Sequence, residues 1–282
     1  MSGPAVDVGV LSRVVAAAGQ GAVGAVVGAI LSALSEPIVN RVLVKRIPLQ
    51  QAMEEVSFEV IAKFFQTTLP TNFVKFPFFE AVNVIMSMVD VSPALRGTVT
   101  GAVFTTATLP ITNYRYRKSM GLPIELSSLY QAYLPTVLRD IMYGIVRNNV
   151  TTMMISRNPQ FAQTNTGRFF NMFITVFSAC VLSAPGNEYR GYCLQPKGKE
   201  KPFVEFFQPQ NFLRSTVIGS TIMSTALGAG ALVTPQVTAL VDKMKAYLDA
   251  NPLSYCIIAL FLAHRVLEKY EKDKQVSSKA GK

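Results

Sequence analysis

Three prolines divide the sequence into similar parts. Pro37, Pro110 and Pro185 lie 73 and 75 residues apart, and each stands near the end of a long apolar run. The segments that they open are alike: Pro-Ile-Val-Asn-Arg-Val, Pro-Ile-Thr-Asn-Tyr-Arg and Pro-Gly-Asn-Glu-Tyr-Arg. A fixed period indicates a repeated structural unit. We therefore predict three units, each with a helix kinked at its proline, a basic loop and a return helix, because proline removes a helical hydrogen bond.

Long stretches without charged side chains accompany the repeat. Residues 14–34, 97–114, 169–187 and 215–241 contain no Asp, Glu, Lys or Arg. Charged residues make up only 16% of the chain, where soluble domains have about a quarter. Since roughly 20 apolar residues suffice to cross a bilayer as a helix, these four stretches predict four membrane spans.

Two further apolar stretches carry charges at depth. Lys75 and Glu80 interrupt residues 70–89, and Arg139 and Asp140 lie in the return helix of the second unit. Charges inside a membrane span are costly unless they face protein or water. These side chains are therefore expected to face the interior of a helical bundle.

Two other segments have local signals. Residues 19–24 read Gly-Gln-Gly-Ala-Val-Gly, which fits either a dinucleotide-phosphate loop or a glycine-lined packing face of a helix. Helix packing is favoured, because the glycines continue to Gly28 and no acid follows about 20 residues later, as a dinucleotide site needs. Residues 49–64 have apolar positions on one helical face and predict a helix at the membrane surface.

Charge and cysteine content exclude several classes of protein. The net charge of +10 is spread over short loops and the tail, so it favours membrane topology over nucleic-acid binding. Three scattered cysteines and one histidine predict neither a metal site nor a disulfide framework, and no enzyme is expected. Residues 1–13 lack the pattern of a removable presequence. Basic clusters follow the first helix of each unit, which predicts both termini on the opposite side of the membrane.

The repeat resembles the mitochondrial carrier family over about residues 9–235. The family ends its odd helices with P-x-[DE]-x-x-[KR], and residues 130–140 match its entry to an even helix, Y-x-x-x-x-P-T-x-L-R-D. The resemblance implies an all-α protein with six tilted transmembrane helices around a cavity and short surface helices on the matrix side. It also implies the mitochondrial inner membrane, termini in the intermembrane space and bound phospholipid such as cardiolipin. The repeats would span about residues 9–91, 92–157 and 158–235.

The sequence departs from the family at the matrix gate, a ring of six residues that forms salt bridges in carriers. The three acid positions hold Val39, Thr112 and Asn187, and the three basic positions hold Val42, Arg115 and Arg190. The arginines are therefore expected to lack their usual partners. The aromatic-acid-x-x-basic pattern of the even helices is also not found near residues 87–90 and 152–157, so both gates are expected to be lost.

The substrate contact points are partly kept. The resemblance places Arg139, Asp140 and Arg214 at contact points, while Val74 stands at another with Lys75 beside it. An Arg-Asp pair there is similar to carriers of amino acids or related carboxylates. The alternative is that the two residues pair with each other or with neighbours and only stabilise the bundle.

The last segment, residues 236–282, extends beyond the resemblance. Residues 238–250 predict an amphipathic helix, and residues 253–263 are apolar but too few to cross a bilayer, so they must pack on protein. The extension and the lost gates favour a structural or accessory subunit of a large inner-membrane complex, of the respiratory-chain or ATP-synthase type. Its partners would be the bilayer and other subunits. The alternative is an active solute carrier for amino acids or related carboxylates.

Overall fold

The computed structural model describes residues 8–41, 48–119, 123–195 and 201–251, together with Leu253, His264 and Glu268. These residues are helical apart from short turns, and none of them forms a strand. The chain divides into two compact units, Met1–Val237 and Thr238–Lys282. The all-α class predicted from the sequence is confirmed.

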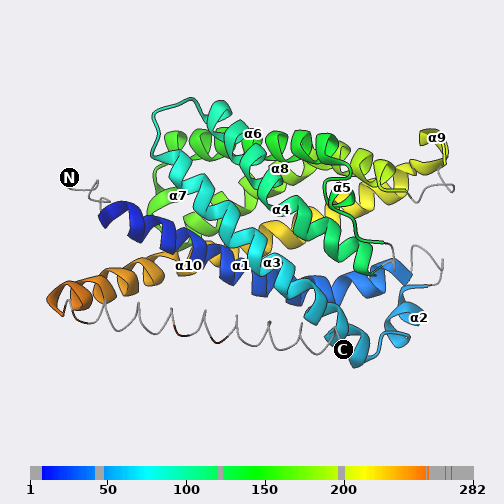
Figure 1. Ribbon diagram of the computed structural model, residues 1–282, viewed down its shortest axis with the longest axis horizontal. Coiled ribbons are helices and arrows are strands. Elements are labelled where there is room, and N and C mark those ends of the chain that lie inside the picture. The colour runs from blue at the N-terminus through cyan, green and yellow to red at the C-terminus, as the bar shows by residue number, and fades with distance from the viewer. Residues whose placement is uncertain are drawn as a thin grey trace. The chain divides into compact units, whose positions relative to one another are not determined.

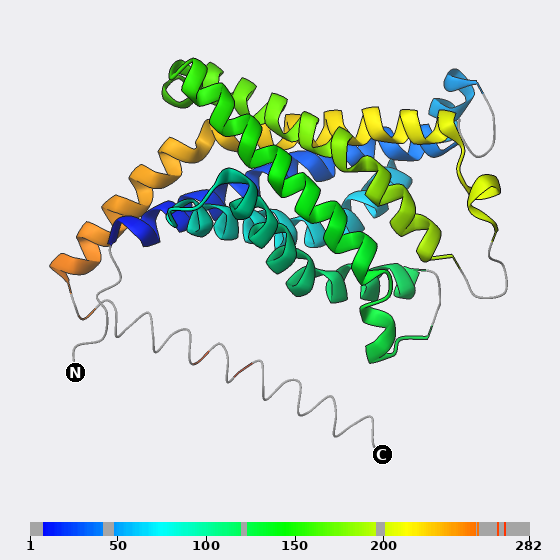
Figure 2. The same ribbon diagram turned by 90° about the horizontal axis from the view of Figure 1, so that it is seen from above.

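Long and short helices alternate in a pattern that occurs three times in the described chain: long, short, long. Figures 1 and 2 show α2, α5 and α9 at one end of the first unit and α7 toward the other. The long helices are α1 (Val8–Asn40), α3 (Phe58–Ser87), α4 (Pro93–Ser119), α6 (Tyr133–Arg157), α8 (Asn165–Cys193) and α10 (Pro209–Ala250). The short helices are α2 (Leu49–Glu54), α5 (Leu126–Leu129), α7 (Gln160–Gln163) and α9 (Phe203–Phe206).

The long helices of the first unit contact one another in a closed order. Contacts join α1 to α3, α3 to α4, α4 to α6 and α6 to α8. The circle closes through α10, where Gly228 packs on Phe169 of α8 and Gly24 of α1 packs on Leu227. A small aromatic core made of Phe79, Phe104 and Tyr143 fills the space between α3, α4 and α6.

Glycines bring some helices into backbone contact. A Cβ atom on Gly21 would lie 2.5 Å from the backbone nitrogen of Pro77 in α3, and one on Gly144 of α6 would lie 2.3 Å from the carbonyl oxygen of Gly97 in α4. Only glycine permits such an approach. The helix-packing interpretation of residues 19–24 is therefore confirmed, since these residues lie inside α1 and face other helices.

The three repeat prolines lie inside helices. Pro37, Pro110 and Pro185 belong to α1, α4 and α8, and each helix continues past its proline. A kink at each proline stays a prediction. The basic loop predicted after Pro110 is wrong, because residues 115–118 continue α4, where Arg117 donates to the carbonyl of Pro123 (2.7 Å) and to Gln131 (3.0 Å).

Two predicted helices have other boundaries. The surface helix predicted at residues 49–64 is broken, because Ser57 caps the start of α3 by accepting from the Val60 amide. The return helix of the second unit begins at Tyr133, because Ala132 has the left-handed φ of 57°.

Three described helices are long and apolar enough to cross a membrane: residues Gly9–Ile38, Asn165–Cys193 and Pro209–Ala250. The span predicted at residues 97–114 forms helix α4 but is not among them. Six threonines lower its hydropathy although it carries no charge. In the second unit, residues 238–250 are helical as predicted, whereas the apolar segment 253–263 lies outside the described residues except for Leu253.

Candidate functional site

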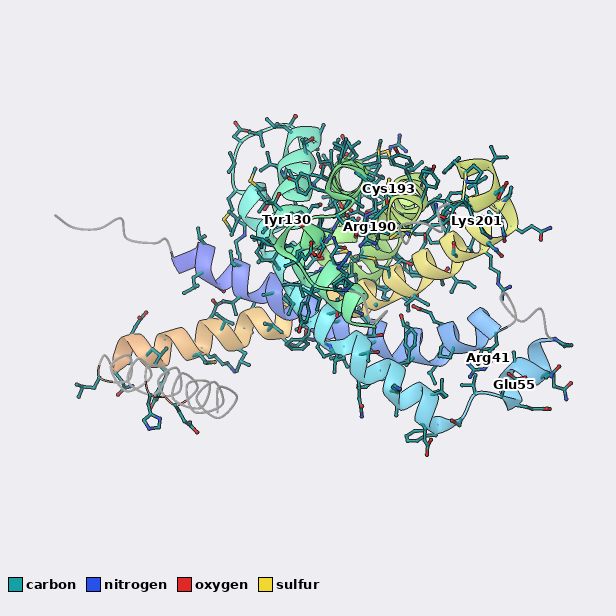
Figure 3. All side chains as sticks on the ribbon, turned by 45° about the vertical axis from the view of Figure 1, so that its right-hand side comes forward. Arg41, Glu55, Tyr130, Arg190, Cys193 and Lys201 are labelled. Carbon is teal, nitrogen blue, oxygen red and sulfur yellow. The ribbon has the colours of Figure 1, made fainter. Side chains whose placement is uncertain are left out.

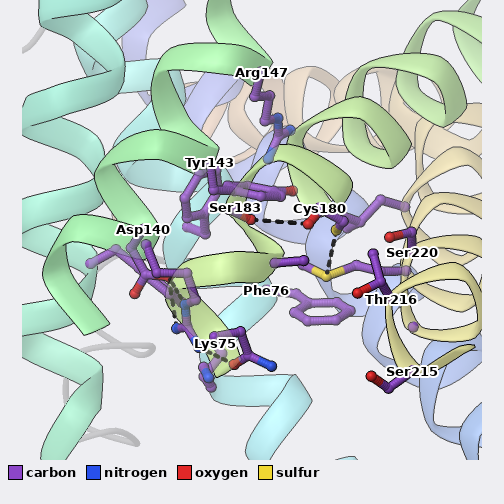
Figure 4. A pocket seen from close by; sticks show the side chains of 18 of the residues that line it. Lys75, Phe76, Asp140, Tyr143, Arg147, Cys180, Ser183, Ser215, Thr216 and Ser220 are labelled. Carbon is purple, nitrogen blue, oxygen red and sulfur yellow. Dashed lines mark hydrogen bonds and ion pairs between the residues drawn. The ribbon is translucent and has the colours of Figure 1, made fainter. Parts of the chain in front are cut away.

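A cavity of about 320 Å³ opens inside the first unit. Five helices, α3, α4, α6, α8 and α10, contribute side chains to its wall. Figure 4 shows Lys75 and Asp140 toward one end of this wall, with Tyr143 and Arg147 toward the other. Aromatic rings, hydroxyls and charged groups all line the cavity, so it offers contacts for both polar and apolar parts of a small molecule.

Arg139 and Asp140 line the cavity and pair with each other. Nη2 of Arg139 lies 2.7 Å from Oδ1 of Asp140, and Nη1 donates to Oδ1 of Asn187 in α8 at 3.0 Å. The second carboxylate oxygen of Asp140 accepts from the Thr105 hydroxyl at 2.6 Å. The structure thus has the mutual pairing that was one of the two alternatives predicted for these residues. It also brings a contact-point residue together with the gate position Asn187.

The other predicted contact residues differ in whether they reach the cavity. Lys75 lines the cavity, with Nζ 5.6 Å from the centre of the Phe104 ring. Arg214 lies on α10 and is not part of the cavity wall, where its neighbour Ser215 is. Val74 is 46% exposed and does not line the cavity either. The cavity therefore brings together Lys75, Arg139 and Asp140 but not Arg214.

Asparagines at or beside the acid positions of the second and third repeats bind arginines of neighbouring helices. Nη2 of Arg190 donates to Oδ1 of Asn113 at 3.2 Å, so Arg190 binds an amide oxygen here, while the expected absence of its usual acid partner stays a prediction. Asn113 is 1% exposed, and its amide nitrogen donates to the carbonyls of Leu129 (2.9 Å) and Gln131 (2.8 Å). We call Asn113, Arg139, Asn187 and Arg190 the amide layer.

Three gate positions lie wholly or partly outside the described residues. Val42 lies outside the described residues, as do the side chains of Val39 and Arg115. Thr112 donates its hydroxyl hydrogen to the carbonyl of Thr108 in its own helix at 3.1 Å. At the end of α1, Arg41 instead forms an ion pair with Glu55 beyond α2, with Nε and Oε2 3.6 Å apart (Figure 3).

A second layer of polar residues, around a buried ion pair, was not predicted from the sequence. Glu80 of α3 and Arg147 of α6 form an ion pair at 2.6 Å, and their side chains are only 4% and 3% exposed. Gln20 of α1 donates to Glu80 at 3.4 Å and accepts from Thr234 of α10 at 2.8 Å. We call Gln20, Glu80, Arg147 and Thr234 the ion-pair layer. It joins four helices.

The sequence carried a signal for this layer. Residues 79–83 read Phe-Glu-Ala-Val-Asn, and residues 143–147 read Tyr-Gly-Ile-Val-Arg. Each is half of the aromatic-acid-x-x-basic pattern: the first keeps the acid and the second keeps the base. The expected loss of this pattern is therefore wrong in part, because it lies earlier in both helices than residues 87–90 and 152–157.

The charges of the cavity wall balance. Lys75, Arg139 and Arg147 are basic, and Glu80, Asp140 and Glu188 are acidic. Arg139 forms a direct ion pair with Asp140, and Arg147 forms one with Glu80. No group of three or more His, Cys, Asp or Glu suited to a metal ion occurs among the described residues. The cavity thus fits a ligand without a large net charge better than a polyanion.

Comparisons with known proteins add no family. A scan against protein-family models finds no match, and searches among curated proteins and solved structures find none either. The resemblance to mitochondrial carriers thus rests on the residues quoted above.

Proposed function

We propose that this chain is a mitochondrial-carrier-like protein of the inner membrane that acts as a structural or accessory subunit of a large complex and no longer transports a solute. The amide layer is the observation that carries this proposal. Arg139 and Arg190, at a contact point and at a gate position, are both held by neutral asparagines of neighbouring helices. A gate that opens and closes needs an attraction that can be exchanged between states, and Thr112 and Asn187 stand where the resemblance expects the acids of such a gate.

The proposal includes the membrane arrangement. All six long helices would cross the membrane. In α3, α4 and α6 the polar residues would face the cavity and the two layers, because charged side chains inside a span need protein or water around them. The ends of α1, α4 and α8 would face the matrix, with cardiolipin-like phospholipid around the short helices, and both termini would face the intermembrane space. The C-terminal unit would bind other subunits of a respiratory-chain or ATP-synthase complex.

The test is to delete residues 238–282, the second unit, and to run solubilised mitochondrial membranes on a native gel. The full chain should migrate with a large complex. The shortened chain should stay in the membrane but migrate alone, because a few buried apolar anchors can decide assembly. If the full chain itself migrates alone, the subunit proposal is wrong.

The second candidate is a solute carrier for amino acids or related carboxylates, and the charged cavity favours it. Purified chain in liposomes should then exchange such solutes, and Arg139→Ala should abolish the exchange. Arg214→Ala is the matched control, because Arg214 is not part of the cavity wall. Exchange that survives Arg139→Ala would count against this cavity as the transport site.

A further inference from the structure

Two hydrogen-bond donors at the inner end of the cavity have no acceptor. The hydroxyl of Tyr143 and Nη1 of Arg147 are both buried and lack a hydrogen-bond partner. The two residues are 7% and 3% exposed, lie one turn apart on α6, and both line the cavity. The guanidinium of Arg147 and the hydroxyl of Tyr143 attract each other, yet neither Nη1 nor the hydroxyl has a partner within the distance and angle limits of a hydrogen bond. Figure 4 shows them on the same side of the cavity, next to Cys180.

Such groups are rare in folded proteins. A buried donor without an acceptor loses its hydrogen bonds to water and gains nothing in return, so nearly all are satisfied by protein, ligand or ordered water. The other contacts of Arg147 are fixed: Nη2 binds Glu80 at 2.6 Å and lies 3.5 Å from the Met172 sulfur. An acceptor for Nη1 and for the hydroxyl therefore has to come from the cavity.

The surroundings define the charge of that acceptor. Arg147 is already neutralised by Glu80, and Arg139 by Asp140. A carboxylate placed beside Glu80 would add an uncompensated charge to a buried region, which is costly. A carbonyl oxygen accepts the same two hydrogen bonds without that cost. The acceptor is therefore best an uncharged oxygen.

The surroundings also define the body of the ligand. Phe79 packs against both Tyr143 and Arg147, and the same cavity is also lined by Phe76, Phe104, Met223 and Leu227. The sulfur atoms of Cys180 and Met223, which both line the cavity, lie 3.7 Å apart. Aromatic rings and soft sulfur atoms pack well against a flat apolar group.

We propose that this cavity binds an uncharged carbonyl compound with an apolar body of about one substituted ring, whose oxygen accepts from Tyr143 and Arg147. The site lies one to two helical turns from the Arg139–Asp140 pair. The proposal depends on the cavity and its two donors, and it is independent of whether the chain transports a solute or assembles into a complex.

The test uses the full chain in lipid nanodiscs and two probes with the same carbon skeleton. Duroquinone has two carbonyl oxygens and a fully substituted ring that does not alkylate thiols, and durene lacks the oxygens. Duroquinone should raise the unfolding temperature as a ligand of the folded state does, and durene should raise it less. Tyr143→Phe should weaken duroquinone binding roughly 5- to 10-fold, the effect of one lost hydrogen bond.

Tyr133→Phe is the matched control, because this tyrosine lies on the same helix, is 38% exposed and has Thr106 as partner. It should leave duroquinone binding unchanged. Equal effects of the two probes would overturn the proposal, since the donors would then play no part. The proposal would also be overturned if the protein bound L-leucine but not duroquinone, and if Asp140→Asn abolished the binding of L-leucine. That result would indicate a site for a zwitterion. Absence of any binding would assign the two donors to buried water.

Discussion

The two polar layers of the bundle bind their arginines with different groups. In the ion-pair layer, an acid and a base lie opposite each other in almost complete burial. In the amide layer, two arginines bind asparagine oxygens and one of them is 19% exposed in its side chain. The ion-pair layer thus depends on one fully buried ion pair, whereas the amide layer combines asparagine oxygens with the Arg139–Asp140 pair.

The layers also join different helices. The ion-pair layer connects α1, α3, α6 and α10, while the amide layer connects α4, α6 and α8. Only α6 takes part in both. We therefore expect the two ends of the bundle to differ in strength, with the ion-pair layer the harder one to open.

Removing one partner of the buried ion pair should have the largest effect. Glu80→Ala leaves Arg147 charged and buried, and breaking such a pair costs about 3–5 kcal/mol. Thermal or denaturant unfolding in detergent would measure the loss. Glu59→Ala, an exposed acid in the first turn of the same helix, should cost less than about 1 kcal/mol. The double variant Glu80→Leu/Arg147→Leu should recover most of the stability, and equal losses in the single and double variants would contradict this account.

The contact of α6 with α4 should be almost as sensitive. Gly144 lies in the turn that carries Tyr143 and Arg147, and its added Cβ would meet the Gly97 carbonyl. Gly144→Ala should therefore push the helices apart and destabilise the protein by about 2–3 kcal/mol, as overpacking does. Gly219→Ala has open space and should stabilise α10 by about 0.5–1 kcal/mol. If Gly144→Ala leaves the stability unchanged, the contact between α4 and α6 can widen at little cost.

The sequence predicted the elements better than the layers. Charge-free runs and the spacing of the prolines indicated α1, α4, α8 and α10, because burial in a bundle requires continuous apolar faces, while α3 and α6 were predicted from apolar stretches that carry charges. Asn113 could not be predicted as a partner of Arg190, because it stands one position after the expected acid. The Glu80–Arg147 pair depends on two residues 67 positions apart. Half of a motif in each helix identifies such a pair only when the packing of α3 on α6 is known.

Helix boundaries were missed for local reasons. Ser57 caps the start of α3, and the left-handed Ala132 turns the chain before α6. The spacing of apolar residues does not predict either feature. The cavity was predicted through three residues that do line it, Lys75, Arg139 and Asp140. Its inner end, with Tyr143 and Arg147, was not, because tyrosine in an apolar helix is usually part of the core.

In the amide layer, Asn113 should matter most. Asn113→Ala removes three hydrogen bonds at a position that is 1% exposed and leaves two carbonyls of the α5–α6 connection without this donor. We expect a loss of about 2 kcal/mol, since a hydrogen bond contributes about 1 kcal/mol on average and the loss of three is only partly felt. Asn149→Ala, an exposed asparagine bonded only within α6, should change the stability by less than about 0.5 kcal/mol.

The smallest effect should come from making the amide layer more like the ion-pair layer. Asn187→Asp turns the hydrogen bond from Arg139 into an ion pair at an exposed position, and such pairs add about 0.5 kcal/mol. The new acid also lies near Asp140 and Glu188, which repel it, while Arg139 between them attracts both. The gain should therefore be small, fall with added salt as screened charges do, and vanish in an Arg139→Gln background. A loss of stability in place of a gain would mean that repulsion among the acids prevails. The asparagine at this position would then be the better partner for an arginine that Asp140 already neutralises.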